Sequence, residues 1–474
     1  MSFYSSDGGL PRRFRLIRSS FMQQDGLTFA QVLPEETIEQ AFADADADFA
    51  QEEGDIYTPA VTLWAFLSQA LHAKEQRSCR AAVARVIVLL VALSSELCSD
   101  NTGAYCRARA KLPRAVIRRL TTDVADGCEQ RLPTPWLWKA KHVHLVDGTT
   151  ASMPDTPDNQ TAYPQPSSQQ EGLGFPMTRM VVLLSLATGM VKGMAMGPYA
   201  GKETGEPALL RELFARLGPG DILLGDRYYC SYFMIALLQE LHIDFVVRLH
   251  QRRDADFRRG QRLGAGDHVV TWTKPAKPEW MDEATYERMP ASLQIREVQV
   301  DIHQPGFRTE SLVVVTTLTD AQEYTKEDIA ELYHRRWLVE LDIRAIKITM
   351  GMDVLRCQSP EMVRREIWTC LLAYNLIRQT MLEAAITSER SPRELSFTAA
   401  LQKIAAAWAI LSVCDDALLA QMIEAHLSDI ATNKVGNRPD RVEPRAIKRR
   451  PKAHKLLTEP RDAARAKLGV EIDE

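Results

Sequence analysis

HVHLVDGTT, residues 142–150, is the stretch at which the sequence changes from helical patterns to short apolar runs rich in β-branched residues. Four further runs of this kind follow it: TRMVVLLSLATGM (178–190), VKGMAMGPYA (191–200), DILLGD (221–226) and HIDFVVRLH (242–250). Runs of this length, bounded by Gly, Asp or Pro, are typical of β-strands. Helical patterns separate the later runs, at 207–217 and 232–241. Strands followed by strand, helix, strand alternation predict an α/β fold with a helix-covered sheet.

The stretches on either side of these runs are mainly helical in pattern. Residues 33–113 carry apolar residues at spacings of three and four, which predicts an all-helical N-terminal domain. Residues 251–323 are polar and contain prolines, but two apolar runs within them, at 296–302 and 311–318, predict a β-rich insertion. Helical patterns then return, and a tail with little periodicity follows; the helical segments are 326–349, 361–384 and 397–430.

The composition indicates a globular protein without a strong charge bias. Of its 474 residues 45% are hydrophobic, and 58 basic against 62 acidic side chains give a formal net charge of -4. This balance excludes a uniformly basic nucleic-acid binder, so any contact with nucleic acid must come from local basic patches. The eight cysteines form no CxxC pair, which favours reduced core thiols over disulfides or a zinc site.

No segment indicates a membrane or secreted protein. The longest apolar run, VIVLLVAL at 86–93, is too short to cross a bilayer and predicts a buried helix. The N-terminus has no apolar region followed by a small-residue cleavage site. A cytoplasmic protein with no membrane contact is therefore expected.

Two aspartates follow the apolar part of predicted strands. Asp147 ends HVHLVD and Asp226 ends DILLGD. Carboxylates at the carboxyl ends of neighbouring strands lie over the crevice in which α/β sheets bind ligands. Each aspartate alone has a structural alternative, because Asp-Gly is a common turn and Asp226 could cap the following helix.

The helix predicted at 326–351 carries a polar stripe. At ~100° per residue, Tyr333, Arg336, Glu340 and Lys347 fall within a stripe about 60° wide, while apolar residues fill much of the remaining surface. A polar stripe on a buried helix must be paired or functional, because an unpartnered buried charge is costly. The alternative is an internal salt bridge of Glu340 with Arg336 or Arg344, each four residues away.

The three acids Asp147, Asp226 and Glu340 together suit a metal site. Oxygen-rich carboxylate sites bind Mg²⁺ or Mn²⁺, and two such ions can activate a water or a 3′-hydroxyl and stabilise the leaving oxygen. Arg336 and Lys347 would then face the phosphates.

Two further residues receive structural interpretations. Glu206 reads as an acid at a helix start, stabilised by the helix dipole, rather than as a metal ligand. Trp337 lies off the polar stripe and is expected in the core.

The spacing of Tyr333, Arg336, Glu340 and Lys347 resembles the Tyr-Arg-Glu-Lys signature of bacterial insertion-sequence transposases of the Asp-Asp-Glu class, which cut DNA through hairpin intermediates. Four segments are also similar to that family, and the resemblance covers most of residues 35–455; they are VDGTT around Asp147, GLGFPMTRM (172–180), LGDRYY around Asp226 and EPRAIKRRPK (443–452). The resemblance implies Mg²⁺-dependent cut-and-paste transposition by a synaptic homodimer on the terminal inverted repeats of a mobile element.

The resemblance also implies roles for single residues. Tyr333, Arg336 and Lys347 would grip the terminal phosphate and the transposon-end DNA. The family uses a base-stacking tryptophan in its insertion, for which Trp272 and Trp280 are the candidates. Neither lies in a motif that aligns, so the hairpin step stays open.

The implied architecture is an RNase H-like catalytic core with a β-rich insertion, preceded by an all-helical N-terminal domain and followed by C-terminal helices. The expected bounds are 1–135 for a helical DNA-binding domain, 136–250 for the first part of the core, 251–324 for the insertion, 325–385 for the second part of the core with the Glu-bearing helix, and 386–474 for C-terminal helices and a basic tail.

Two basic segments have both a structural and a DNA-binding interpretation. Between 434 and 455 nine basic side chains stand against two acidic ones, which indicates either a solvated run or a phosphate-binding arm that includes Arg445, Lys448, Arg449 and Arg450. The arginine-rich stretch 101–120 is either a solvated helix face or a DNA-contacting helix.

Two alternatives to a transposase remain at this point. One is an inactive or domesticated relative that binds DNA without cutting it. The other is a host metal-dependent nuclease, which would have no need of the Tyr, Arg and Lys stripe.

Overall fold

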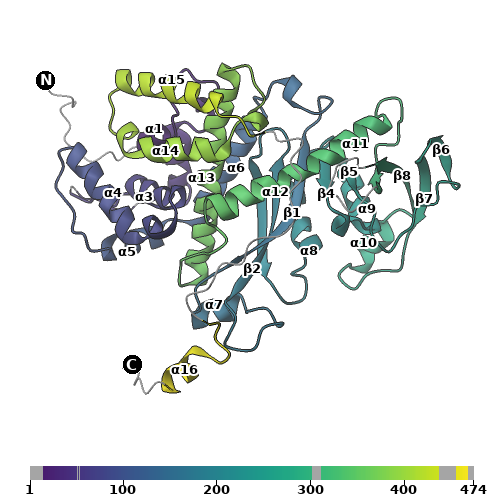
Figure 1. Ribbon diagram of the computed structural model, residues 1–474, viewed down its shortest axis with the longest axis horizontal. Coiled ribbons are helices and arrows are strands. Elements are labelled where there is room, and N and C mark those ends of the chain that lie inside the picture. Colours follow the sequence, from purple (N-terminus) through teal and green to yellow (C-terminus); the bar gives the residue numbers. More distant parts are fainter. Residues whose placement is uncertain are drawn as a thin grey trace.

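The computed structural model describes residues 14–47, 49–50, 52, 54–301, 311–436 and 455–467. Within them, one mixed sheet of nine strands has the order β3-β2-β1-β4-β5-β9-β8-β7-β6 (Figure 1). The strands are β1 Val143–Ser152, β2 Met177–Ser185, β3 Val191–Pro198, β4 Ile222–Gly225, β5 Asp244–Arg248, β6 Gln261–Gly264, β7 Asp267–Thr273, β8 Ser292–Asp301 and β9 Ser311–Thr316. The prediction of an α/β fold is confirmed.

Strand β1 organises the first half of the sheet. It pairs antiparallel with β2, which pairs antiparallel with β3. On its other side it pairs parallel with β4, which pairs parallel with β5. Strands β9, β8, β7 and β6 continue from β5 by antiparallel pairing, so the strands within 251–323 extend the central sheet.

The central strands are apolar on both faces because helices cover both. Alternate residues of β1 and β4 enter two separate cores: Leu145 and Leu224 enter one, and Val146 and Leu223 enter the other. The first core includes the N-terminal helices and α13 (Pro360–Thr387), and the second includes α8 and α9. Strands buried on both sides read as continuous apolar runs, as ILLG at 222–225 does, whereas HVHLVD at 142–147 also contains two histidines.

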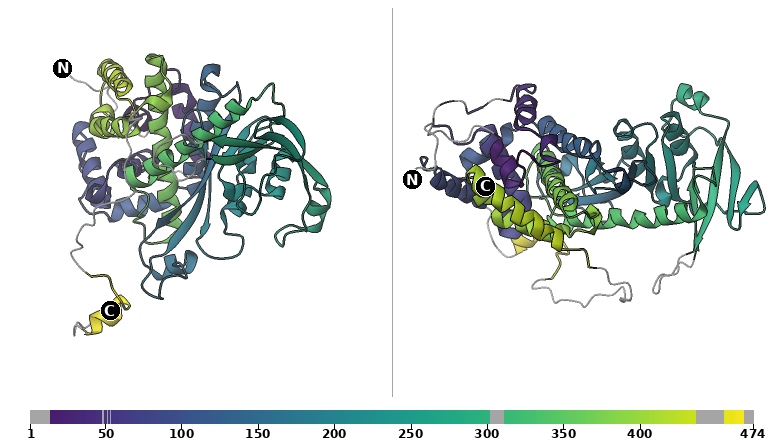
Figure 2. Two further views of the ribbon diagram at one scale, coloured as in Figure 1. Left: turned by 45° about the vertical axis from the view of Figure 1, so that its right-hand side comes forward. Right: turned by 90° about the horizontal axis from the view of Figure 1, so that it is seen from above.

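Most of the helices gather at one end of the sheet, where α1 to α6 lie beside α13 to α15, and strands β6 to β8 lie at the opposite end (Figures 1 and 2). The helices at the first end are α1 Arg15–Ser20, α2 Glu35–Ala43, α3 Pro59–Leu71, α4 Cys79–Ala92, α5 Gly103–Lys111, α6 Arg114–Glu129, α13, α14 Phe397–Leu411 and α15 Asp416–Thr432. The others are α7 Pro157–Ala162, α8 Glu206–Arg211, α9 Tyr232–Glu240, α10 Glu283–Arg288, α11 Lys326–His334, α12 Leu338–Arg344 and α16 Arg461–Lys467.

Helix α13 connects the N-terminal helices to the sheet. It packs against α3, α6, α14 and α15, and most of its 28 residues are buried. Buried polar groups are normally hydrogen-bonded, and the buried side chain of Asn375 forms its hydrogen bonds with two other elements, β3 and α6. Its side chain accepts from the backbone N–H of Val191 on β3 and donates to the carbonyl of Thr121 on α6, at 2.8 Å each.

The helix α4 is only partly buried, although a buried helix was expected at 86–93. The run 86–93 is helical, but it is buried on one face only: Val86, Leu89 and Leu90 are in the core, whereas Val88 and Val91 are more than half exposed. None of the helices in the described ranges combines the length and the apolar character that crossing a membrane requires.

The stretch from α11 to α12 runs along one side of the sheet, in contact with β1, β5, β8 and β9 (Figure 2). A buried ion-pair cluster holds its second half in place. The carboxylate of Asp342 on α12 is 1% exposed and accepts from Arg378 on α13 at 2.6 Å and from Arg393 at 2.8 Å. Two cations from different elements thus fix the position of α12.

Substitution Asp342→Asn will lower the free energy of unfolding by about 3–5 kcal/mol, because it leaves two buried guanidinium groups without a counter-charge. Urea denaturation measures the change. The control Glu331→Gln removes an exposed ion pair with Arg335 on the same helical stretch and will change stability by less than about 1 kcal/mol. Equal effects of the two substitutions would contradict the role of Asp342.

Candidate active site

The parallel pairing of β1 with β4 brings Asp147 and Asp226 together. Leu145 pairs with Leu224, and each aspartate stands two residues farther along its strand. Neighbouring strands lie about 4.8 Å apart, so the two side chains start from adjacent backbone positions. The two acids thus lie on neighbouring strands, as expected, and Asp226 directly follows the last residue of β4. Asp147 does not end its own strand, however, because β1 continues to Ser152 through its pairing with β2.

Asp226 caps the 3₁₀ turn that follows it. It precedes the 3₁₀ turn Arg227–Tyr229, and its carboxylate accepts from the backbone N–H of Arg227 at 2.5 Å. The capping alternative is therefore confirmed. An ionised carboxylate has two oxygens and about four acceptor positions, so the cap leaves most of its capacity for another ligand.

Asp147 lies in a partly desolvated, negatively charged environment. Its carboxylate accepts from the backbone N–H of Gly148 at 2.8 Å. Burial, reinforced by the nearby acids Glu206 and Asp226, raises the pKa of Asp147 to about 6, although Gly148 and Arg336 act in the opposite direction. Burial raises a carboxyl pKa because it disfavours the charged form, and the neighbouring acids act in the same direction.

Arg336 is the cation that faces all three acids. Its guanidinium donates to Glu340 at 3.0 Å, and both Asp147 and Asp226 act on it electrostatically. The salt bridge between Glu340 and Arg336, which was the structural alternative for Glu340, is therefore present. It coexists with the convergence of the three carboxylates around one guanidinium.

The helix that bears Glu340 is not uniform. Helix α11 ends at His334, a 3₁₀ turn covers Arg335–Trp337, α12 covers Leu338–Arg344, and a π-helical turn covers Ala345–Thr349. The expectation of one regular helix is wrong here. A 3₁₀ turn advances a side chain by more than 100° per residue and a π turn by less, so a regular wheel misplaces residues beyond each interruption.

The interruptions separate the members of the polar stripe. Tyr333 is buried beside Arg336 and Asp226, and burial raises its pKa to about 12. Lys347 lies in the π-helical turn, where burial lowers its pKa and the acid that acts on it is Asp353. The structure thus groups Tyr333 and Arg336 with the three acids and gives Lys347 a different acidic neighbour.

Trp337 also departs from expectation, since 49% of it is exposed. It lies in the 3₁₀ turn, which directs its ring away from the core in which the regular wheel placed it.

The two tryptophans of the insertion differ in access. Trp272 is 5% exposed, donates to Glu297 at 3.2 Å and carries Arg253 over its ring at 3.9 Å. Trp280 is 37% exposed, with Arg211 over its ring at 3.9 Å. Of these two rings, Trp280 is the one that is accessible from solvent.

Glu206 is a residue of the site that sequence reasoning assigned to another role. It starts α8, as expected, but its carboxylate packs against Gly148, next to Asp147. The hydroxyl of Tyr229 donates a hydrogen bond to this carboxylate at 3.3 Å, and burial raises the pKa of Glu206. No motif links residues this far apart in the sequence; only the presence of glycine after Asp147 hints that something approaches closely there.

The basic residues predicted in the tail, Arg445, Lys448, Arg449 and Arg450, lie outside the described residues.

Comparisons with known proteins decide the family. Residues 138–376, just over half of the chain, match the family described as Transposase DDE domain. The chain belongs to this family. The transposase is similar to the Escherichia coli K12 transposase InsG for insertion sequence element IS4, at 27% identity over 356 residues, which covers 74% of this chain and 77% of that protein.

Two other similarities are more limited. The Escherichia coli transposase for insertion sequence element IS421 is 35% identical over 65 residues, covering 14% of this transposase and 18% of that protein. The piggyBac transposase in a synaptic complex with hairpin DNA matches at a TM-score of 0.41 and 10% identity, covering 90% of this chain and 87% of that chain.

The chain is thus a DNA transposase of the insertion-sequence type, an enzyme that cleaves DNA and transfers strands. This result settles the choice between a transposase and a host nuclease in favour of the transposase.

Transposases of this family generally use divalent metal ions. Within the described ranges, no three His, Cys, Asp or Glu side chains stand close enough to enclose a metal ion. The donor set nevertheless fits Mg²⁺ or Mn²⁺, because both ions prefer carboxylate oxygens.

Substitution Gly148→Ala will reduce DNA cleavage by about 10–100-fold, because a Cβ at this position overlaps the carboxylate of Glu206 and displaces it or Asp147. A cleavage assay on a labelled transposon-end DNA measures the loss. The control is Gly197→Ala on β3, whose added Cβ meets Leu209 at an ordinary 3.6 Å. Wild-type cleavage by Gly148→Ala would show that the close packing against Glu206 has no bearing on catalysis.

Proposed function

We propose that Asp147, Asp226 and Glu340 are the catalytic carboxylates of the transposase and hold its Mg²⁺ or Mn²⁺ ions. The observation that carries the proposal is the convergence of the three acids, from β1, the end of β4 and α12, on the guanidinium of Arg336. Acids from three elements are brought together although close approach of like charges is unfavourable, and such arrangements cluster at functional sites.

In this proposal, the three acids and Arg336 have different roles in phosphoryl transfer. Asp147 and Asp226 offer oxygens fixed by paired strands, and Glu340 offers an oxygen from a helix held by Asp342. When bound, the metal ions activate the attacking water or 3′-hydroxyl and stabilise the leaving oxygen. Arg336 presents planar N–H donors that match a phosphate bidentately.

Tyr333, Arg336, Glu340 and Lys347 form the Tyr-Arg-Glu-Lys signature in this proposal. Tyr333, Arg336 and Lys347 bind the terminal phosphate and the transposon-end DNA. The burial of Tyr333 beside Arg336 supports a role in orienting that guanidinium. Trp280, the accessible tryptophan of the insertion, is the better candidate for stacking on a flipped base if cleavage proceeds through a hairpin.

The architecture proposed around this site is an RNase H-like core formed by 136–250 and 325–385. The strand order β3-β2-β1-β4-β5, with an antiparallel meander followed by two parallel strands, supports it. Residues 251–324 are the insertion, and 1–135 and 386–474 are the helical DNA-binding domain and the C-terminal helices with the basic tail.

Substitution Glu340→Gln will abolish cleavage at the boundary of the element's own terminal inverted repeats, with a loss on the order of 10³-fold or more, because an amide cannot replace an anionic ligand. Binding to the same DNA, measured by gel shift, will stay within about threefold of wild type. Chelation with EDTA will remove the activity and added Mg²⁺ or Mn²⁺ will restore it.

The matched control is Glu331→Gln, an exposed acid of α11 whose partner is Arg335. It will cleave at the wild-type rate. Full cleavage by Glu340→Gln would remove Glu340 from the catalytic set, whereas equal loss in the control would point to a general effect on the helix.

The proposed partners are the terminal inverted repeats and the target DNA, held by a homodimer in the synaptic complex. The net charge of -4 means that phosphate contacts must come from local patches, and the basic tail is the densest one in the sequence.

Replacing Arg445, Lys448, Arg449 and Arg450 by Gln will weaken DNA binding and reduce the slope of log K against log salt by up to about 3.6, because each lost phosphate contact removes about 0.9 from the slope. Fluorescence anisotropy at several salt concentrations measures it. A control that exchanges Arg and Lys at the same four positions keeps the charge and will keep the slope. An unchanged slope in the Gln variant would show that the tail does not contact DNA.

A further inference from the structure

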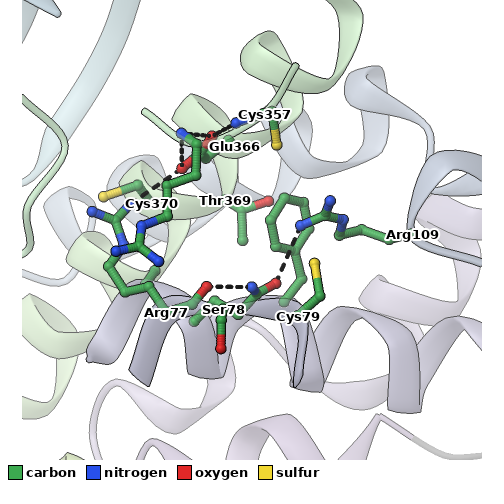
Figure 3. Close-up of a pocket in the computed structure, with 12 residues that line it drawn as sticks. Arg77, Ser78, Cys79, Arg109, Cys357, Glu366, Thr369 and Cys370 are labelled. Atoms are coloured by element: carbon green, nitrogen blue, oxygen red, sulfur yellow. Dashed lines mark hydrogen bonds and ion pairs between the residues drawn. The ribbon is translucent and has the colours of Figure 1, made fainter. Parts of the chain in front are cut away.

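A pocket of about 220 Å³ lies away from the three carboxylates, between the N-terminal helices and α13 (Figure 3). Residues from α3, the start of α4, α5, the segment after α12 and α13 line it. At ~30 Å³ per water molecule, the pocket holds several waters, yet it is smaller than the ~300–1,000 Å³ typical of sites for drug-sized ligands. Its size therefore suits a small polar ligand.

The charges around the pocket do not cancel. Arg77, Arg109, Arg356 and Glu366 all line it. Glu366 pairs with Arg77 at 3.2 Å and accepts from the backbone N–H of Arg356 and of Cys357, so its oxygens are fully engaged. Within the described chain, neither Arg109 nor Arg356 has a carboxylate within ion-pair distance of its guanidinium. The lining therefore carries two positive charges in excess, one on the partly buried Arg109 and one on the exposed Arg356.

Arg109 is held in a way that leaves donor capacity. Its guanidinium lies over the rings of Phe66 and Tyr105, at 4.9 and 5.6 Å, and donates one hydrogen bond to Gln69 at 3.3 Å. Its Nε is buried and has no hydrogen-bond partner among the described residues. An unpaired buried donor on a charged group is costly, which indicates that a further acceptor completes this environment.

A second side chain that lines the pocket, Thr369, also has a buried polar atom without a hydrogen-bond partner among the described residues. Thr369 on α13 is 1% exposed, lines the pocket, and its hydroxyl has no hydrogen-bond partner within the described ranges. Figure 3 shows its oxygen on the side of the pocket that faces Arg109.

The first turn of α4 adds to the positive potential. Ser78 and Cys79 line the pocket, and the 14-residue helix begins there with Ser78 as its cap, accepting from Ala81 N–H at 3.1 Å. The positive end of the helix dipole and its unpaired N–H groups favour an anion at this place.

We propose that this pocket binds a phosphate dianion, either inorganic phosphate or a terminal phosphate monoester. The two unpaired guanidinium groups match its charge, and the free hydroxyl of Thr369, the Nε of Arg109 and the start of α4 offer donors to its oxygens. A backbone phosphodiester carries a single charge and matches the excess less well. Bound phosphate would join α4 and α5 to α13 and to the segment that follows α12.

The test is isothermal titration calorimetry of the full chain with inorganic phosphate, with thymidine 5′-monophosphate and with thymidine, at ionic strength kept constant with NaCl. We expect saturable binding of phosphate, no binding of thymidine, and at least a tenfold weaker phosphate affinity in Arg109→Gln. If both phosphate and thymidine 5′-monophosphate bind, the pocket accepts a phosphate monoester. If phosphate binds and thymidine 5′-monophosphate does not, the pocket accepts only the free ion.

Two variants keep the result interpretable. Thr369→Val preserves shape, removes only the unpaired hydroxyl and will weaken phosphate binding several-fold, whereas Arg107→Gln changes an exposed arginine of the same helix and will bind as wild type does. Circular dichroism checks that each variant is folded. Absence of saturable phosphate binding, or equal binding by wild type, Arg109→Gln and Thr369→Val, would overturn the proposal.

Discussion

The guanidinium of Arg336 offsets the negative charge of Asp147, Asp226 and Glu340 in this transposase. It pairs directly with Glu340 and acts at longer range on Asp147 and Asp226. The pKa of Asp147 is nevertheless raised to about 6, mainly because the acid is buried and also because Glu206 and Asp226 are near it. The rest of the fold holds the acids in place.

That support comes from two directions. The register of β1 against β4 fixes the two aspartates, because backbone hydrogen bonds along paired strands leave little freedom to slide. On the helical side, Asp342 binds two arginines, one of which belongs to α13. Since α13 also bonds to β3 and α6 through Asn375, the helix that carries Glu340 is connected to both the sheet and the N-terminal helices. Rigid elements of this kind hold functional groups more accurately than loops do.

Much of this arrangement follows from local sequence patterns. The strands that carry Asp147 and Asp226 and the helix that carries Glu340 were predictable, because buried strands and buried helices have distinct periodicities. What could not be predicted depends on contacts between distant segments. The 3₁₀ and π turns on either side of α12 have no signal in the local periodicity, so Trp337 was misplaced. The approach of Glu206 to Gly148 likewise arises only when α8 packs against β2 and β3.

Crystals soaked in Mn²⁺ will test whether Asp147, Asp226 and Glu340 form the metal site of this transposase. We expect an anomalous-scattering peak within coordination distance of oxygens of all three acids, with the guanidinium of Arg336 no longer paired to Glu340. A Mn²⁺ peak elsewhere in a catalytically competent crystal, with Arg336 and Glu340 still paired, would contradict it.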